Sequence, residues 1–89
     1  MGHRRREKLL KELDRVRRNV KVGSYYAHYK HPGEKHYVII EVGFYESNEE
    51  ACVVYKSLEW GLVWIRTLEN FLEKVEVQGK KVKWFSVVK

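Results

Sequence analysis

The sequence has very little cysteine or proline and no long apolar run. Its 89 residues include one cysteine, Cys52, and one proline, Pro32. A single cysteine cannot form an internal disulfide, which favours a reducing compartment. No segment approaches the roughly 20 consecutive apolar residues that cross a bilayer, and no signal peptide is visible. We therefore expect a cytoplasmic protein that does not enter a membrane.

The sequence also lacks the groupings that catalysis and metal binding require. It has no Cys-x-x-Cys pair, no glycine-rich phosphate loop and no pair of glutamates that stands out as acid and base. His28, His31 and His36 crowd one hairpin, but His31 falls in its loop rather than on the strand face of His28. Cys52 lies within an apolar strand, where a cysteine behaves as a small hydrophobe. We expect no catalytic residue, no metal site and no cofactor.

Aromatic side chains and positive charge are what the sequence does have. Three Trp, six Tyr and three Phe supply the large surfaces from which a single domain of 89 residues builds its thin core. The net charge of +6 is uneven, because residues 1–18 carry +5 and the rest of the chain is almost neutral. An excess of this kind bears on partners and solubility rather than on fold.

The basic segment predicts an amphipathic helix over residues 4–18. Leu9, Leu13, Val16 and Val20 recur at intervals of four, three and four, which places them on one helical stripe. The stripe is suited to capping an open barrel end, and self-association through it is an alternative. The segment is too short to indicate a coiled coil.

We divide the chain into this helix, residues 1–22, and a β domain, residues 23–89. The helix exposes basic side chains that are suited to contact with phosphates or with an acidic protein. A solvated outer face is the plainer interpretation. The predicted electrostatic contacts are Arg4, Arg5, Arg6, Lys8, Lys11, Arg15, Arg17 and Arg18.

After Gly23 the apolar pattern changes to the period of two that is typical of strands. Thr67 is predicted to cap a single helical turn, residues 68–71, and Gly43 to mark a bulge or a sharp bend. Strands are predicted over residues 24–30, 36–45, 51–57 and 62–66, followed by a hairpin of 75–77 with 82–88. Because the chain is too short for a standard two-sheet sandwich, we predict a mainly β fold, a small five-stranded SH3-like barrel behind the N-terminal helix.

Several motifs add a family resemblance. They are Tyr-Ala-His-Tyr-Lys at residues 26–30, Val-Val-Tyr at 53–55, Trp-Ile-Arg-Thr at 64–67 and the following Phe71. In this order, with Tyr-Val at residues 37–38 after the first motif, they resemble the bacterial family catalogued as domain of unknown function 1653, whose pattern runs Y-x-H-Y-K-G, Y-x-V, V-V-Y-x-x-L, W-V-R-P and F. The resemblance covers roughly residues 23–85 and implies a compact β-barrel-like domain, with no established activity.

The chain departs from the family pattern at a few positions. Thr67 stands where relatives have proline, and Glu59-Trp60-Gly61 replaces a loop with Tyr-Gly. Tyr45 and Ser47 stand where relatives usually have a histidine and an acid after the second strand. The resemblance therefore implies that a polar site of relatives at that turn is lost here.

The surplus of aromatic residues points to binding rather than to chemistry. SH3-like barrels often bind peptides, modified lysines or nucleic acid through aromatics on one face, by caging a cation or by stacking on bases. Trp60, in a loop, is expected to be exposed, whereas Trp64 and Phe71 are better explained as core or barrel-end filling. The predicted ligand-binding residues are Tyr26, His28, Tyr29, Tyr55, Trp60, Trp64 and Arg66.

The leading hypothesis is therefore a non-enzymatic binding module, with RNA or DNA favoured as partner because charge and aromatics occur together. The alternative is a protein-interaction or adaptor domain, of phage or mobile-element type, that uses the helix stripe or a strand edge. A small enzyme or metal protein is a third interpretation. The sequence leaves the oligomeric state open.

Overall fold

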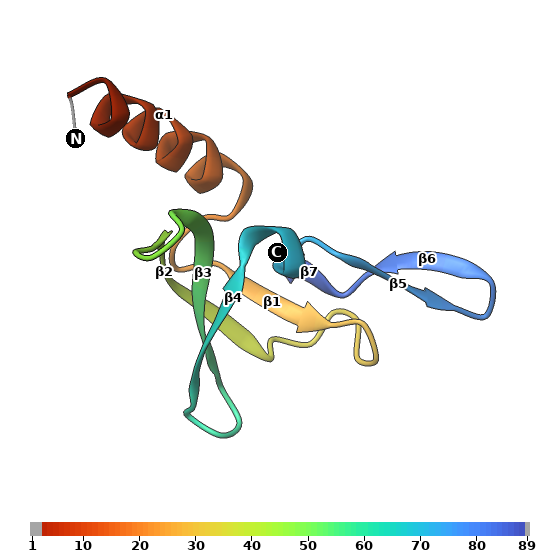
Figure 1. Ribbon diagram of the computed structural model, residues 1–89. Helices are drawn as coiled ribbons and strands as arrows, with labels where there is room; N and C mark the ends of the chain where they lie inside the picture. Colours follow the sequence, from red (N-terminus) through yellow and green to blue (C-terminus); the bar gives the residue numbers. More distant parts are fainter. Residues whose placement is uncertain (1–2, 89) are drawn as a thin grey trace.

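The chain begins with one long helix and continues as antiparallel strands (Figure 1). A computed structural model describes residues 3–88. The elements follow in the order α1 (His3–Asn19), β1 (Tyr25–His28), β2 (Tyr37–Tyr45), β3 (Glu50–Ser57), β4 (Val63–Thr67), α2 (Leu68–Phe71), β5 (Lys74–Val77), β6 (Lys80–Lys83) and β7 (Phe85–Val88).

Five strands form one antiparallel sheet in the order β4-β3-β2-β1-β7, and β5 and β6 pair only with each other. The prediction of a mainly β fold behind an N-terminal helix is confirmed. The closed five-stranded barrel is not formed, because β4 and β7 are the two edges of the sheet and do not pair with one another. Both edges therefore offer unpaired backbone groups.

Strand β2 carries a bulge at Ile40. The residues on either side of it pair with consecutive residues of β3, so Ile40 is left out of the register. The extra residue shifts the alternation of faces, and as a result Ile39 and Val42 are both buried while Ile40 is exposed. The prediction of a bulge at Gly43 is wrong, since Gly43 pairs in regular register with Cys52.

Helix α1 packs on the sheet through its apolar stripe. Val16 and Val20 are 1% and 0% exposed and belong to the same core cluster as the strands, with Leu13 packed against that cluster. The helix ends at Asn19, and Gly23 adopts the left-handed conformation, with φ of +86°, that turns the chain into β1. The helix predicted over residues 4–18 is confirmed.

The core of the sheet is aromatic and centres on the contact of α2 with β7. Phe71 and Phe85 stack with ring centroids 4.7 Å apart and planes within 5° of parallel. Tyr26 and Tyr55 pack their rings on Phe71 at 5.1 and 5.6 Å. All four side chains are buried. The prediction that Phe71 fills the core is therefore confirmed.

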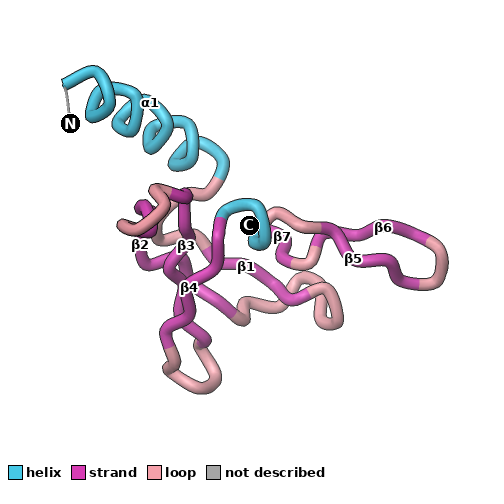
Figure 2. Tube along the Cα trace, viewed as in Figure 1, coloured by secondary structure: helices cyan, strands magenta, loops and turns pink. Residues whose placement is uncertain are grey.

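The single turn α2 begins where the sequence indicates. Thr67 Oγ1 accepts a hydrogen bond from the backbone N–H of Asn70 at 3.2 Å, which confirms the predicted N-cap. Because the turn follows β4 directly, it reverses the chain and carries Phe71 over the sheet (Figure 2).

The segment predicted as one strand over residues 82–88 is broken at Trp84. Residues before Trp84 pair with β5, and residues after it pair with β1. The backbone N–H of Trp84 donates to Glu73 O at 3.1 Å, and its carbonyl accepts from Tyr29 N at 2.9 Å. Strands β5 and β6 are thereby released from the sheet and project from it as a two-stranded ribbon, residues 74–83 (Figure 1).

Candidate functional site

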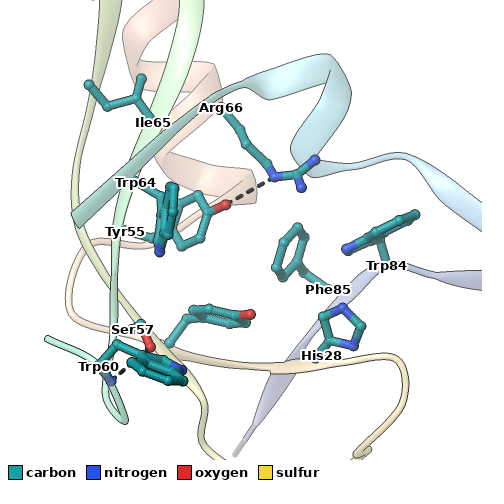
Figure 3. Close-up of a pocket in the computed structure, with 10 residues that line it drawn as sticks. His28, Tyr55, Ser57, Trp60, Trp64, Ile65, Arg66, Trp84 and Phe85 are labelled. Atoms are coloured by element: carbon teal, nitrogen blue, oxygen red, sulfur yellow. Dashed lines mark hydrogen bonds between the residues drawn. The ribbon is translucent and has the colours of Figure 1, made fainter. Parts of the chain in front are cut away.

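An aromatic pocket of about 510 Å³ opens at the end of the sheet where β3 turns into β4 (Figure 3). All three tryptophans of the chain line it. The lining is completed by side chains from β1, β2, β3, β4 and β7. We name this the aromatic pocket; its lining residues are His28, Tyr37, Tyr55, Ser57, Trp60, Trp64, Ile65, Arg66, Trp84 and Phe85.

The β3–β4 hairpin positions one side of the pocket. Trp64 lies directly opposite Tyr55 in the antiparallel register, and Arg66 follows Trp64 on the same face because strand side chains alternate. In the turn, the backbone N–H of Trp60 donates to Ser57 Oγ at 3.2 Å. The next residue, Gly61, has φ of +72°, which the turn requires and which glycine adopts readily.

Arg66 lies at the inner side of the pocket, where its guanidinium is held by aromatic rings. Its Nε donates to Tyr55 Oη at 2.9 Å. The guanidinium carbon lies 5.6 Å from the Trp84 ring centroid and 5.3 Å from that of Phe85. Because these contacts fix the plane of the guanidinium, Arg66 is a preorganised cation rather than a mobile surface charge (Figure 3).

His28 closes the side of the pocket that faces β7. Its ring packs on Trp84 at 5.9 Å and on Tyr29 at 4.6 Å. Burial lowers the pKa of His28 below its ordinary value, and repulsion from Lys30 and other nearby cations lowers it further. The imidazole is therefore favoured in its neutral form, which packs against aromatic rings without a desolvation penalty for charge.

Tyr37 forms the floor of the pocket. Its ring contacts Tyr55 edge-on at 5.3 Å and Phe85 at 5.4 Å. Burial raises the pKa of the Tyr37 hydroxyl, so the phenol stays protonated and can donate a hydrogen bond to a ligand.

The rim of the pocket is unusually exposed for aromatic side chains. Trp60 is 74% exposed and Trp64 is 49% exposed. The expectation that Trp60 is exposed is confirmed. The expectation that Trp64 fills the core is wrong, because Trp64 lines the open pocket and does not belong to the core cluster. Large exposed aromatic surfaces beside a cation are typical of ligand contacts.

Five of the seven predicted ligand-binding residues meet at the pocket: His28, Tyr55, Trp60, Trp64 and Arg66. Tyr26 lies elsewhere, buried in the core, where its ring packs edge-on against Phe71 at 5.1 Å. Tyr29 lies just outside the pocket, where it packs edge-on against Trp84 at 5.3 Å.

Sequence reasoning missed the contributions of Tyr37 and of the segment around Trp84. Tyr37 stands at the tyrosine of the family's Y-x-V element, where Ile39 replaces the valine, and this element could have indicated it. Trp84 had no comparable signal, because its role depends on the break between β6 and β7.

The formal charge of the pocket lining is positive. Of the described residues that line it, Arg66 is the charged one and none is acidic. A methylated lysine would meet the guanidinium of Arg66 without a carboxylate to offset it, so the cation-cage interpretation loses support. A planar group on Trp60 or Trp64 with a phosphate near Arg66 suits the lining better.

The basic helix lies away from the pocket. None of the α1 side chains that the structure describes lines it, and Figure 1 shows α1 at the opposite end of the sheet from the β3–β4 turn. Two of its arginines contact acids of the β2–β3 hairpin: Arg17 Nη2 lies 3.3 Å from Glu41 Oε1, and Arg5 pairs with Glu49. The two predicted surfaces, basic helix and aromatic face, are therefore separate.

The remaining predicted cations of α1 lie on its outer surface. Arg15 lies 3.8 Å from Glu12, one turn back on the same helix. Arg6, Lys8, Lys11 and Arg18 are exposed, and the side chain of Arg4 lies outside the described residues.

Within residues 3–88, no three His, Cys, Asp or Glu side chains gather as a metal site would require. His31 and His36 approach each other at 5.3 Å in the β1–β2 loop. Of the helices in this part of the chain, neither is long and apolar enough to span a membrane.

Comparison with known proteins gives one match. No curated protein and no solved structure matches the chain. A family model described as "Protein of unknown function (DUF1653)" matches residues 24–87, a span that holds every lining residue of the aromatic pocket and leaves α1 outside. The sequence resemblance is thus confirmed over most of the chain, which belongs to the DUF1653 family.

Proposed function

We propose that the protein is a non-enzymatic module that binds single-stranded nucleic acid, with an unpaired base in the aromatic pocket. The observation that carries the proposal is the gathering of all three tryptophans around one arginine, in a lining with no acid among the described residues. Base stacking on an aromatic ring contributes about 1–3 kcal/mol per base and needs no particular sequence.

Single strands suit the pocket better than a duplex. A base must leave its stack to lie flat on Trp60 or Trp64, and unpaired strands allow this without the cost of opening base pairs. A phosphate next to that base would then meet Arg66, whose guanidinium is already oriented by Tyr55 and Trp84.

Positive charge adds long-range attraction to this contact. The net charge of +6 raises the local concentration of a polyanion around the whole molecule. The exposed cations of α1, at the far end of the sheet, contribute to this field.

We also propose that the sheet is an open form of the SH3-like barrel. Its last strand, β7, returns to pair with its first, β1, and a single helical turn follows β4. This order of elements supports the proposal. If the edge strands β4 and β7 curled toward one another, the aromatic pocket would lie in the gap between them.

Binding to labelled oligothymidylate and oligouridylate of about 12 nucleotides tests the proposed function. Trp60→Ala should weaken binding by roughly tenfold, since it removes one stacking surface. Tyr45→Ala is the matched control: Tyr45 is also an exposed aromatic but lies at the β2–β3 turn, away from the pocket. Tyr45→Ala should leave the affinity unchanged.

Tryptophan fluorescence is a second readout of the same experiment. Because every tryptophan lines the pocket, stacking of bases should quench the emission as binding saturates. Lack of binding by the unaltered protein at low salt, or equal losses in Trp60→Ala and Tyr45→Ala, would overturn the proposal.

A protein-interaction function is the second candidate, and the edge strand β4 favours it. Val63 and Ile65 are more than half exposed on a strand with one free edge, to which an extended peptide could add. Two results together would favour this candidate. The unaltered chain would bind no nucleic acid, and Ile65→Pro would abolish capture of a protein partner.

A further inference from the structure

The β5–β6 ribbon, residues 74–83, projects from the sheet with almost nothing packed around it. Val75 is its one residue that is not exposed, and its strands pair only with each other. An isolated two-stranded hairpin is marginally stable in water. A ribbon of this kind is therefore suited to gain its order from a partner.

The charge of the ribbon indicates the chemistry of that partner. Its ten residues hold four lysines and one glutamate, a net charge of +3. Lys74 lies directly opposite Lys83 in the register, an arrangement in which like charges repel across the strands. A polyanion would relieve this repulsion, whereas an apolar or cationic partner would not.

A groove runs along the ribbon. With a volume of about 510 Å³, it lies between the ribbon and the β1–β2 loop, and Tyr29, Pro32 and Ser86 form its far side. On the ribbon side it is lined by Val77, Val82, Lys80 and Lys83. The groove thus combines apolar surface with two lysines.

The groove and the aromatic pocket share one wall. Trp84 lines the pocket and Tyr29 lines the groove, and the two rings contact each other edge-on at 5.3 Å. Trp84 directly follows the last residue of β6, so the base of the ribbon is also the edge of the pocket. A chain that leaves the pocket over Trp84 would enter the groove.

We propose that the β5–β6 ribbon and its groove form the phosphate-binding track for the same single strand whose base occupies the aromatic pocket. This inference rests on the proposed function. Beyond the phosphate at Arg66, it assigns the direct phosphate contacts to the ribbon lysines, and it leaves to α1 only the long-range attraction. Helix α1 is remote from the pocket, whereas the ribbon adjoins it.

The test compares two variants of the full chain that each lose three positive charges. The ribbon variant is Lys80→Gln, Lys81→Gln and Lys83→Gln; the helix variant is Lys8→Gln, Lys11→Gln and Arg18→Gln. All six side chains are exposed, so neither variant should disturb the fold, which circular dichroism checks. Binding to oligothymidylate of about 12 nucleotides is measured at salt concentrations from about 50 to 200 mM.

The slope of log affinity against log salt concentration distinguishes direct phosphate contacts from long-range attraction. Each phosphate contact to a single strand contributes about 0.7 to the slope of log K against log salt, so the ribbon variant should lower the magnitude of the slope by about 2. The helix variant should lower it by less than half as much. Replacing the same three ribbon residues by arginine should keep the slope.

Three outcomes would overturn the inference, and they differ in what they leave standing. Equal slopes for the ribbon variant and the unaltered chain, or a larger change in the helix variant, would overturn the phosphate track but not the aromatic pocket, provided Trp60→Ala still weakens binding. Failure of the unaltered chain to bind at about 50 mM salt would overturn both proposals.

Discussion

Helix α1 and the β5–β6 ribbon are two basic appendages of one sheet. The net charge is +5 over the 17 residues of the helix and +3 over the ten residues of the ribbon, so the charge per residue is almost the same. They differ in what else they do. The helix, with the residue that follows it, buries Val16 and Val20 in the core, and it pairs Arg17 with Glu41. The ribbon buries almost nothing. The comparison teaches that a high density of positive charge does not by itself identify a binding surface. A basic segment such as α1 can serve mainly to pack against the core.

The largest expected effect is on the free energy of unfolding, to which helix α1 contributes more than the ribbon does. Val16→Ala with Val20→Ala should lower the free energy of unfolding by about 3 kcal/mol, because each change removes two buried methylene-sized groups and leaves a cavity. Val77→Ala with Val82→Ala, at positions 37% and 38% exposed, should cost less than about 1 kcal/mol. Urea unfolding followed by circular dichroism measures both. Similar losses of unfolding free energy in the two double variants would contradict the view that only the helix is part of the core.

A smaller effect comes from two glycines with positive φ. Gly23, between α1 and β1, has φ of +86°, and Gly79, in the ribbon turn, has φ of +78°; a Cβ at either would meet no atom within 4 Å. Alanine should therefore cost about 1 kcal/mol at each site through backbone strain alone. Gly23→Ala should lower global stability, because the backbone N–H of Gly23 donates to Ile39 O at 2.8 Å in the core strand.

Gly79→Ala should instead act locally. Because the ribbon pairs only with itself, its opening does not require the sheet to unfold. Amide hydrogen exchange should show about fivefold faster exchange across residues 74–83 and unchanged exchange in β2 and β3. An equal fall in global stability for both alanine variants would show that the ribbon is coupled to the core after all.

The sequence predicted the elements well where a local pattern determines them. The intervals of Leu13, Val16 and Val20 predicted α1, and Thr67 predicted the start of α2. It failed at Trp84 and at the bulge, because both depend on which distant strand each segment pairs with. The alternation of apolar residues over 80–88 is interrupted at Trp84-Phe85. A bulge within one strand would interrupt it in the same way, so the sequence does not indicate that β6 and β7 belong to different sheets.

The same reasoning explains the partial prediction of the site. His28, Tyr55, Trp60, Trp64 and Arg66 were identified because residue type and family motif marked them. The exposure of Trp64 was harder to predict, since it depends on how far the core cluster extends along β4. The ribbon groove escaped prediction altogether, because its two sides come from loops and strands far apart in sequence.

The pKa of His28 indicates whether a bound nucleic acid lies near the ribbon or near helix α1. Its pKa is lowered by burial, then by Lys30, His36, His31 and Arg66. A phosphate near the wall shared by pocket and groove would favour the imidazolium, so saturating oligothymidylate should raise the pKa of His28. Binding should then strengthen as pH falls through the range in which His28 gains its proton. An NMR titration of His28 with and without oligonucleotide measures this, and an unchanged pKa in the saturated complex would place the strand elsewhere.

The smallest expected effect concerns the ion pair that holds α1 to β2. The pKa of Glu41 lies below its ordinary value, first because its carboxylate accepts a hydrogen bond from the backbone N–H of Val42 at 3.0 Å, and second because of Arg17. Arg17→Gln should raise this pKa only part of the way back, since the bond from Val42 remains. Lys81→Gln, in the ribbon, should leave the pKa of Glu41 unchanged. NMR titration of the Glu41 carboxyl carbon measures both variants.

The sign of the pH dependence follows from the direction of that shift. A carboxyl with a lowered pKa in the folded state stabilises the fold above its unfolded pKa, and the contribution is lost as pH falls through the folded pKa. The unfolding curves of the Arg17→Gln variant and the unaltered chain should therefore differ at neutral pH and converge in acid. Divergence that persists below the pKa of Glu41 would mean that Arg17 fastens the helix through packing of its alkyl chain rather than through charge.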